Sequence, residues 1–317
     1  MLGSMRLSIA GVCGVLLSCS GAPVPAASAD KEGPADVPGA HVVVLGSGTP
    51  VADPDRAGPS TAIVVGDVGL VFDAGANVLR RLEAASGRHP ALAPERVTRV
   101  FLTHLHSDHV LGLDELLAGA WVLGRDTPLQ IWGPPGTREL VDGLRAAFAD
   151  DRRVRTEGLE GLEDRGSEVA VREVSPGLVL RSPGRDGVEV RAFAVPHGSW
   201  STAYGYVVEA GGRRIVISGD TAASEAVVEA CDGCDVLVHE VCSGAGLRRL
   251  GEGARAYHGS FHTTARELGG LALRARPDRL VLTHILFFGE REASIAAEVR
   301  EGGYEGELFV AWDLAGY

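Results

Sequence analysis

Short apolar runs rich in β-branched residues recur from residue 41 to the end of the chain and predict strands, because each run is bounded by glycine, aspartate or histidine. The alternation of these runs with segments of helical apolar spacing predicts an ordered core over most of the chain. The predicted strands are 41–46, 61–65, 69–73, 96–104, 129–133, 168–174, 178–182, 188–197, 203–210, 213–220, 235–241, 278–284 and 307–314.

Five segments between these runs have apolar residues at helical spacing, such as Val110, Leu113, Leu117 and Trp121 within 108–124. The other predicted helices are 76–86, 136–149, 224–231 and 263–276. Buried strands followed by polar loops, with helices between them, are typical of a layered α/β architecture with helices outside. We find no repeat of fixed period and no second linker, so one domain spanning 41–317 is expected.

The first 40 residues differ in composition from the rest of the chain. Arg6 precedes an apolar stretch of signal-peptide length, which is too short for an ordinary membrane-spanning helix. The stretch ends in "LLSC", and residues 1–19 therefore resemble a bacterial lipoprotein signal in which Cys19 would carry a lipid anchor. A plain secretory peptide is the alternative, and either interpretation predicts export to the periplasm or outer surface. Residues 20–40, rich in Ala, Pro and Ser, predict a flexible linker.

The net charge bears on the expected binding partners, and the cysteine content bears on possible zinc or disulfide sites. The formal net charge is −12 and hydrophobic residues make up 45% of the chain, so a substantial core is expected and non-specific attraction to nucleic acid is not. Cys231 and Cys234 have CxxC spacing without a second pair to complete a zinc site. A disulfide between them and two ordinary buried thiols both remain open.

The segment "FLTHLHSDHVLG" concentrates His104, His106, Asp108 and His109 directly after an apolar run. Alone it allows a solvated loop, a proton relay or a metal site. Three other predicted strands also end in a histidine or an aspartate, and strand ends on a rigid sheet can fix a multi-metal site. Imidazole and carboxylate suit Zn²⁺ or a similar first-row metal. The further candidate ligands are His197, Asp220 and His284.

These residues together resemble the signature of the metallo-β-lactamase superfamily, HxHxDH, here His104 to His109. The resemblance covers nearly all of 41–317 and implies a four-layer αββα sandwich. Within the superfamily the chain looks most like the branch of ribonuclease Z and related arylsulfatase-type and phosphodiesterase enzymes. The segments that carry this likeness are "GSGTP", "LVFDAG", "GPPGT", "VPHG", "SGDT", "DVLVHE", "HTTARELG" and "LTH".

The resemblance implies a role for each position. His104, His106 and His197 would bind one zinc, and Asp108, His109 and His284 would bind the other, with Mn²⁺ or Fe²⁺ as alternative metals. Asp220 would bridge both metals together with the attacking hydroxide, and Asp108 also counts among the catalytic residues. His262 would assist the leaving group and Glu240 would orient it. Asp73 is expected to support the metal loops, and His258 either lines the substrate pocket or is an ordinary loop residue.

One departure from the ribonuclease Z pattern shapes the expected substrate. Only 22 residues separate His197 from Asp220, and they predict a plain hairpin where tRNA-processing members carry a long arm. Together with the acidic charge and the export signal, this argues against nucleic acid as a partner. We therefore expect a small ester, first a phosphodiester, with an aryl sulfate, a lactone or another carboxylic ester as alternatives and tRNA 3′ processing as the function implied by the family. A redox enzyme using iron, a surface-tethered binding protein and a homodimer remain open.

Overall fold

The computed structural model describes residues 39–182 and 187–317. The predicted signal segment 1–19, with Cys19, and nearly all of the predicted linker 20–40 lie outside these described residues. Across the described ranges, no helix is both long and apolar enough to cross a membrane.

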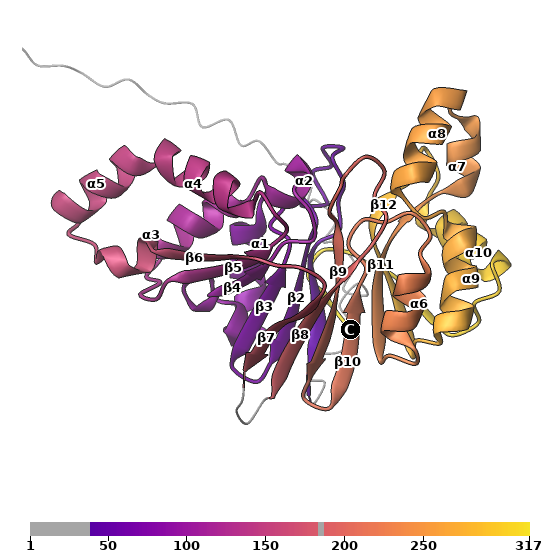
Figure 1. The fold of residues 1–317 in the computed structure, drawn as a ribbon, viewed down its shortest axis with the longest axis horizontal. Coiled ribbons are helices and arrows are strands. Elements are labelled where there is room, and N and C mark those ends of the chain that lie inside the picture. The colour runs from indigo at the N-terminus through magenta and orange to yellow at the C-terminus, as the bar shows by residue number, and fades with distance from the viewer. Residues whose placement is uncertain (1–38, 183–186) are drawn as a thin grey trace, which may run out of the picture. The chain divides into compact units, whose positions relative to one another are not determined.

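The strands form two seven-stranded sheets (Figure 1). The first has the order β14-β1-β2-β3-β4-β5-β6, in which β1 to β3 are antiparallel and β3 to β6 are parallel. A hairpin joins β2 to β3, as the sequence predicts. The strands are β1 (His41–Gly46), β2 (Ser60–Val65), β3 (Val68–Phe72), β4 (Arg99–Phe101), β5 (Leu129–Gly133), β6 (Val169–Glu173) and β14 (Ala315–Gly316).

The second sheet has the order β13-β12-β11-β10-β9-β8-β7. Strands β7 to β10 are antiparallel, whereas β10 to β13 are parallel. The segment between His197 and Asp220 contains the hairpin of β9 and β10, as predicted. The strands are β7 (Gly177–Ser182), β8 (Val188–Ala194), β9 (Tyr204–Ala210), β10 (Arg213–Ile217), β11 (Val236–Cys242), β12 (Arg279–Leu286) and β13 (Glu307–Val310).

Three apolar clusters hold four layers together. The central cluster joins the facing sides of the two sheets, with Val44 and Phe101 from the first and Tyr206 and Val238 from the second. The two outer clusters join each sheet to its own helices. In one of them, Leu82 of the helix Val78–Ser86 packs against the first sheet. Because each sheet is buried on both faces, its strands are nearly continuous apolar runs. The predicted αββα sandwich is confirmed.

Helices cover the two outer faces (Figure 1). Helical residues between 78 and 144 pack against the first sheet, and helical residues between 227 and 299 pack against the second. The helices are α1 (Val78–Ser86), α2 (Ser107–Val110), α3 (Ala120–Val122), α4 (Thr137–Ala147), α5 (Ala149–Glu157), α6 (Glu225–Cys231), α7 (Gly244–Arg249), α8 (Glu252–Phe261), α9 (Ala265–Ala275) and α10 (Glu292–Glu301).

The structure differs from the prediction in several helices. The segment 108–124 is not one helix: α2, a π-helical turn over Glu115–Gly119 and α3 replace it. Arg125 is buried below this turn and donates to the carbonyl oxygens of Leu116 and Leu117. Four further helices, α5, α7, α8 and α10, occur in segments for which the sequence predicted no helix. None of the four has a wide apolar stripe, which is why their spacing carried no signal.

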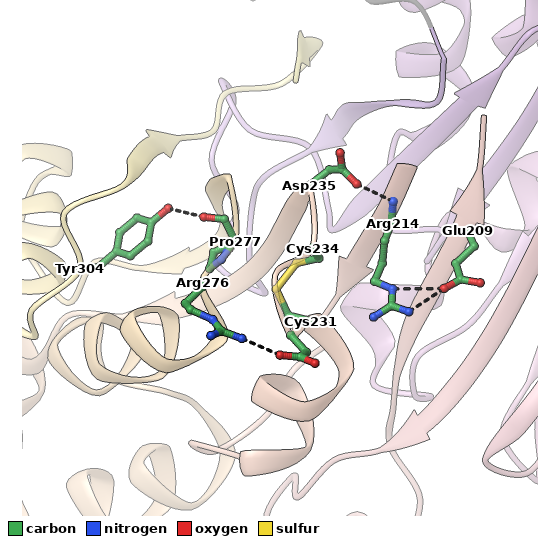
Figure 2. Close-up of a disulfide and its surroundings, with 9 residues drawn as sticks. Glu209, Arg214, Cys231, Cys234, Asp235, Arg276, Pro277 and Tyr304 are labelled. Carbon is green, nitrogen blue, oxygen red and sulfur yellow. Dashed lines mark hydrogen bonds and ion pairs between the residues drawn. A yellow bond between two sulfur atoms is a disulfide. The ribbon is translucent and has the colours of Figure 1, made fainter. Parts of the chain in front are cut away.

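Cys231 and Cys234 form a disulfide, which decides between the two interpretations of the CxxC motif (Figure 2). The bond joins the last residue of α6 to the turn before β11, and both cysteines are buried. Asp232, between them, forms an ion pair with Arg276 at 2.7 Å. Cys242 is a free, buried thiol.

Candidate metal centre

The HxHxDH segment starts beyond the end of β4 and continues into α2. His104 and His106 lie in the extended loop before α2, and Asp108 and His109 lie in its single turn. The change from extended to helical backbone separates the four side chains into two pairs. One short segment therefore supplies ligands to two different donor groups.

The second sheet supplies the other three candidate ligands from the same edge. His197 follows β8, and Asp220 follows β10 after Gly219, whose φ of 62° turns the chain. Gly219 fits because a left-handed φ is readily adopted by glycine. All seven predicted ligands except His106 are buried or nearly so.

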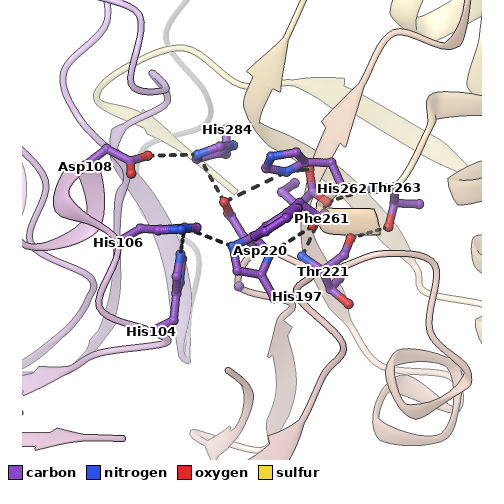
Figure 3. A network of polar contacts seen from close by, with 12 residues as sticks. His104, His106, Asp108, His197, Asp220, Thr221, Phe261, His262, Thr263 and His284 are labelled. Carbon is purple, nitrogen blue, oxygen red and sulfur yellow. Dashed lines mark hydrogen bonds and ion pairs between the residues drawn. The ribbon is translucent and has the colours of Figure 1, made fainter. Parts of the chain in front are cut away.

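His284 does not end its strand, contrary to the prediction, but forms a bulge within β12. Glu240 pairs with Thr283 and Val241 pairs with Ile285, which leaves His284 without a partner across the ladder. Its φ is 44°, an uncommon value for a residue with a side chain. A bulge changes the direction of one side chain at a sheet edge, and this one turns the imidazole toward Asp108 and Asp220 (Figure 3).

Three histidines form the first donor group, with their nitrogens around one point (Figure 3). Nδ1 of His106 lies 3.0 Å from Nε2 of His104 and 3.0 Å from Nε2 of His197. The other nitrogen of His197 donates to the carbonyl oxygen of Phe261 at 2.9 Å. Nδ1 of His197 therefore holds the proton, and Nε2 presents a lone pair to the group.

His104 is held in the same tautomer through Thr103. The Thr103 hydroxyl donates to Oδ2 of Asp73 at 2.8 Å, and its oxygen is 3.0 Å from Nδ1 of His104. Because that hydroxyl proton is used by Asp73, the oxygen accepts from Nδ1–H of His104. The lone pairs on Nε2 of His104 and His197 therefore both face Nδ1 of His106 at 3.0 Å.

Asp108, His109 and His284 form the second donor group. Nε2 of His284 lies 3.2 Å from Oδ2 of Asp108, and Nε2 of His109 lies 3.5 Å from the same oxygen. Nδ1 of His109 donates to Asp73 at 2.8 Å, which leaves Nε2 with a lone pair. Among the described residues, this Nε2 is a buried atom without a hydrogen-bond partner, as expected of a metal ligand.

Asp220 lies between the two donor groups (Figure 3). Its Oδ2 is 3.4 Å from Nε2 of His109 and 3.4 Å from Nε2 of His284. A further possible donor group combines Asp220 with His104 and His109. One carboxylate thus reaches ligands of both groups, which is the geometry of a bridging residue. The residues present fit two divalent cations of the borderline type that imidazole and carboxylate prefer.

The buried carboxylates of the donor groups favour a positive charge close to them. Burial alone lowers the pKa of His109, but the carboxylates of Asp220 and Asp73 outweigh burial and hold it well above its ordinary value. Burial alone raises the pKa of Asp220, but His284 and His109 outweigh burial and hold it well below its ordinary range. Both pKa shifts have one cause: a buried carboxylate and a buried imidazolium each stabilise the charge of the other.

His262 and Glu240 meet beside the bridging carboxylate. Nδ1 of His262 lies 3.3 Å from Oε2 of Glu240 and 3.9 Å from Oδ2 of Asp220. Burial lowers the pKa of His262, but the charges of Glu240 and Asp220 prevail and raise it. Glu240 itself accepts from the backbone N–H of Thr263 at 2.8 Å. The structure thus brings together the two residues that the sequence analysis paired.

Two contributions were not predicted from sequence. Thr103 connects His104 to Asp73, yet a hydroxyl residue beside a ligand has no distinctive spacing. Phe261 orients His197 through its backbone carbonyl, which no sequence pattern reveals. Asp73 lies where we expected a supporting residue and accepts hydrogen bonds from the backbone N–H and hydroxyl of Thr103 and from His109.

Comparison with known proteins identifies the family. The sequence model described as β-lactamase superfamily domain matches residues 69–285. A ribonuclease Z of Mycobacterium bovis is 32% identical over 247 residues, which cover 77% of this chain and 85% of the relative. The chain belongs to the metallo-β-lactamase superfamily and is ribonuclease Z-like.

Solved structures support the fold of this ribonuclease Z-like chain. The metallo-β-lactamase fold protein YhfI of Bacillus subtilis has a TM-score of 0.67 and 19% identity, and the match covers 88% of this chain and 99% of that protein. The short form of human tRNase Z has a TM-score of 0.63 and 23% identity, and the match covers 87% and 98%. At these identities the two structures bear on the fold alone.

The relatives correct our expectation about partners. We argued against nucleic acid and for a small ester from the missing arm, the net charge of −12 and the export signal. The ribonuclease Z of M. bovis contradicts that argument, because a relative at 32% identity is a ribonuclease. Nothing in the described residues supports a lipid anchor at Cys19. Net charge failed as a guide because it averages over the whole surface and does not describe one groove.

Proposed function

We propose that this ribonuclease Z-like hydrolase is a two-metal phosphodiesterase that cleaves RNA, with zinc in both positions. One observation carries the proposal: two donor groups share Asp220, and the His262–Glu240 pair lies directly beside it. Its 32% identity with a ribonuclease Z supports RNA as the substrate. In this donor set, bound metals would supply Lewis acidity and a water of lowered pKa.

The chain's own residues account for the remaining requirements of the reaction. His104, His106 and His197 would hold one metal, and Asp108, His109 and His284 would hold the other. Asp220 would bind both and fix their separation. Thr103 and Asp73 accept from Nδ1 of His104 and His109, so that Nε2 of each ring is the nitrogen that would face a metal. A neutral imidazole is the form in which histidine ligates a metal.

His262 is placed to assist departure of the leaving oxygen. Its Nδ1 faces Glu240, so Nε2 is the nitrogen left to hold a proton for the leaving group. The carboxylate of Glu240 favours the imidazolium form from which that proton can be given. An alkoxide leaving from a phosphodiester requires such a proton, and this requirement favours a nucleoside leaving group over a phenolate.

A substrate panel tests the proposal with the zinc-loaded chain. We expect hydrolysis of bis-p-nitrophenyl phosphate and of an RNA carrying a 3′ extension, and loss of both activities in His106→Ala. Chelation should abolish the same activities, and added zinc should restore them. Turnover of an aryl sulfate or a lactone with neither phosphodiester cleaved would contradict the proposal.

The metal itself needs a separate measurement. Metal analysis after expression in medium balanced in zinc and iron should give two zinc per chain. Iron in both positions, with no hydrolysis, would instead favour the redox class of this fold. A chain that retained every activity after His106→Ala would support a binding protein.

A further inference from the structure

A cavity of about 470 Å³ lies between His258 of α8 and the end of β12. Two segments line much of it: the loop from Gly48 to Arg56, and the residues that follow the bulge at His284. The same loop, including Thr49 and Val51, also lines a second cavity that contains Asp108. The loop is therefore a wall common to this cavity and to the one that Asp108 lines.

The walls of this cavity are mostly apolar and carry partly exposed rings. Phe288 and Val51 line it, and Val51 is 75% exposed although it is hydrophobic. The ring of His258, on α8, lies 4.7 Å from that of Phe288 and 5.9 Å from that of His262. Apolar side chains left open to solvent beside a reaction centre are typical of ligand sites.

The charges around the cavity decide what kind of group fits. Arg56 is the only lysine or arginine among the lining residues, and its guanidinium is already occupied. It donates to Ser47 Oγ at 2.7 Å and forms an ion pair with Glu292 at 2.9 Å. Asp53 adds a negative charge to the lining. A phosphate would meet no free cation here, whereas a flat, neutral ring can stack on an aromatic side chain.

The backbone conformation of Phe288 also supports a ligand site in this cavity. Its φ is 47°, in the left-handed region that residues with side chains rarely adopt. Gly289 follows with a φ of 83°. Backbone strain of this kind persists where surrounding structure maintains it and is common at ligand sites. Here it keeps an aromatic ring at the cavity wall immediately after the segment that carries His284.

We propose that Phe288, with His258 and Val51, forms a stacking subsite for one nucleobase of the RNA substrate. The base belongs to the nucleoside on the leaving side of the scissile phosphate, because His258 lies beside the proposed leaving-group residue His262. This inference rests on the proposed function. The subsite would let the chain hold RNA without a long arm, since the segment between His197 and Asp220 forms only a plain hairpin.

Two dinucleotide substrates test the subsite. One is a diribonucleoside monophosphate, and the other is identical except that hydrogen replaces the base of the leaving nucleoside. The wild type should prefer the complete substrate by about 5- to 150-fold in kcat/KM, the range expected for one base–aromatic stack. In Phe288→Leu, which keeps an apolar side chain but removes the ring, that ratio should approach one. Phe148→Leu, at a half-exposed phenylalanine outside the cavity lining, should keep the wild-type ratio.

Binding separates this inference from the proposed function. Binding of a nucleoside monophosphate to His106→Ala protein should weaken when Phe288→Leu is added, whether or not the wild type cleaves RNA. If the wild type cleaved no phosphodiester but its binding of the nucleotide still depended on Phe288, only the proposed function would be overturned. If Phe288→Leu and Phe288→Ala cleaved RNA with the wild-type preference for the complete substrate, only the subsite would be overturned. Thermal unfolding would show that both variants are folded.

Discussion

Asp73 accepts a hydrogen bond from Nδ1 of His109 at 2.8 Å, and it also accepts from the hydroxyl of Thr103, which orients His104. One carboxylate therefore fixes a ligand in each donor group. Asp73→Asn should lower the affinity for both metals by about 10- to 100-fold, because outer partners of metal-bound histidines have effects of this size. Metal titration followed by elemental analysis measures this loss.

The control for Asp73 is Asp67→Asn, a change at an almost fully exposed carboxylate in the turn between β2 and β3. It should bind metal as the wild type does. Equal affinities for Asp73→Asn and wild type would show that Asp73 is only a structural residue of the loop.

His262 should matter most for poor leaving groups. His262→Ala is expected to lower kcat by about 10²- to 10⁴-fold on a dinucleotide, the usual contribution of a general acid. The loss should be much smaller on bis-p-nitrophenyl phosphate, because p-nitrophenolate leaves without a proton. Steady-state kinetics on the two substrates tests this difference.

Metal content distinguishes the two roles open to His262, which also forms a possible donor group with Asp220 and His284. We expect two metals to remain in His262→Ala. Loss of one metal, with equal loss of activity on both substrates, would make His262 a ligand and not an acid.

Acid should weaken one contact between α5 and the segment before β6. Hydrogen bonds from Arg152 and Ser167 lower the pKa of Asp164 to about 2 from an ordinary 3.8. A depressed pKa stabilises the fold above the ordinary value, and this contribution is lost as the pH falls from about 3.8 toward about 2. Both side chains of the Arg152–Asp164 pair are nearly half exposed, so Asp164→Asn should cost only about 0.5–1 kcal/mol at pH 7.

Urea unfolding of wild type and Asp164→Asn at several pH values checks this sign. The difference in the free energy of unfolding should be constant from pH 7 to about pH 5 and should shrink below about pH 4. A difference that grew on acidification would contradict the assignment.

The disulfide should stabilise the second sheet modestly. Replacing Cys231 and Cys234 together with serine should lower the free energy of unfolding by about 2 kcal/mol, because the bond closes a very short loop. Cys242→Ser, which removes a buried free thiol, controls for the loss of sulfur. Intact-mass measurement before and after reduction should show the bond in protein from an oxidising compartment, and two free thiols there would disprove it.

The structure brings the seven candidate ligands together, and the sequence could single them out because each is a polar residue at or near the end of an apolar strand. That pattern needs only local information, and His104, Asp220 and His197 all followed it. His284 differed, since a bulge depends on the register between β11 and β12, which one strand alone does not reveal.

Other features depended on contacts distant in sequence. The π-helical turn at Glu115–Gly119 lies above the buried Arg125, and neither has a pattern of its own. The helix α7 is only six residues long and α8 is mostly exposed, so the apolar spacing of both is weak. The expectation against nucleic acid as a partner was wrong, because net charge averages over the whole surface and does not describe one binding site.

The donor residues come from both halves of the chain. His104 to His109 follow β4 of the first sheet, whereas His197, Asp220 and His284 belong to the second. Each metal would therefore link the two sheets, and neither half could retain it alone. Cations held there would act as a cross-link that forms only after the sandwich has closed, so metal retention would report correct assembly of the whole fold.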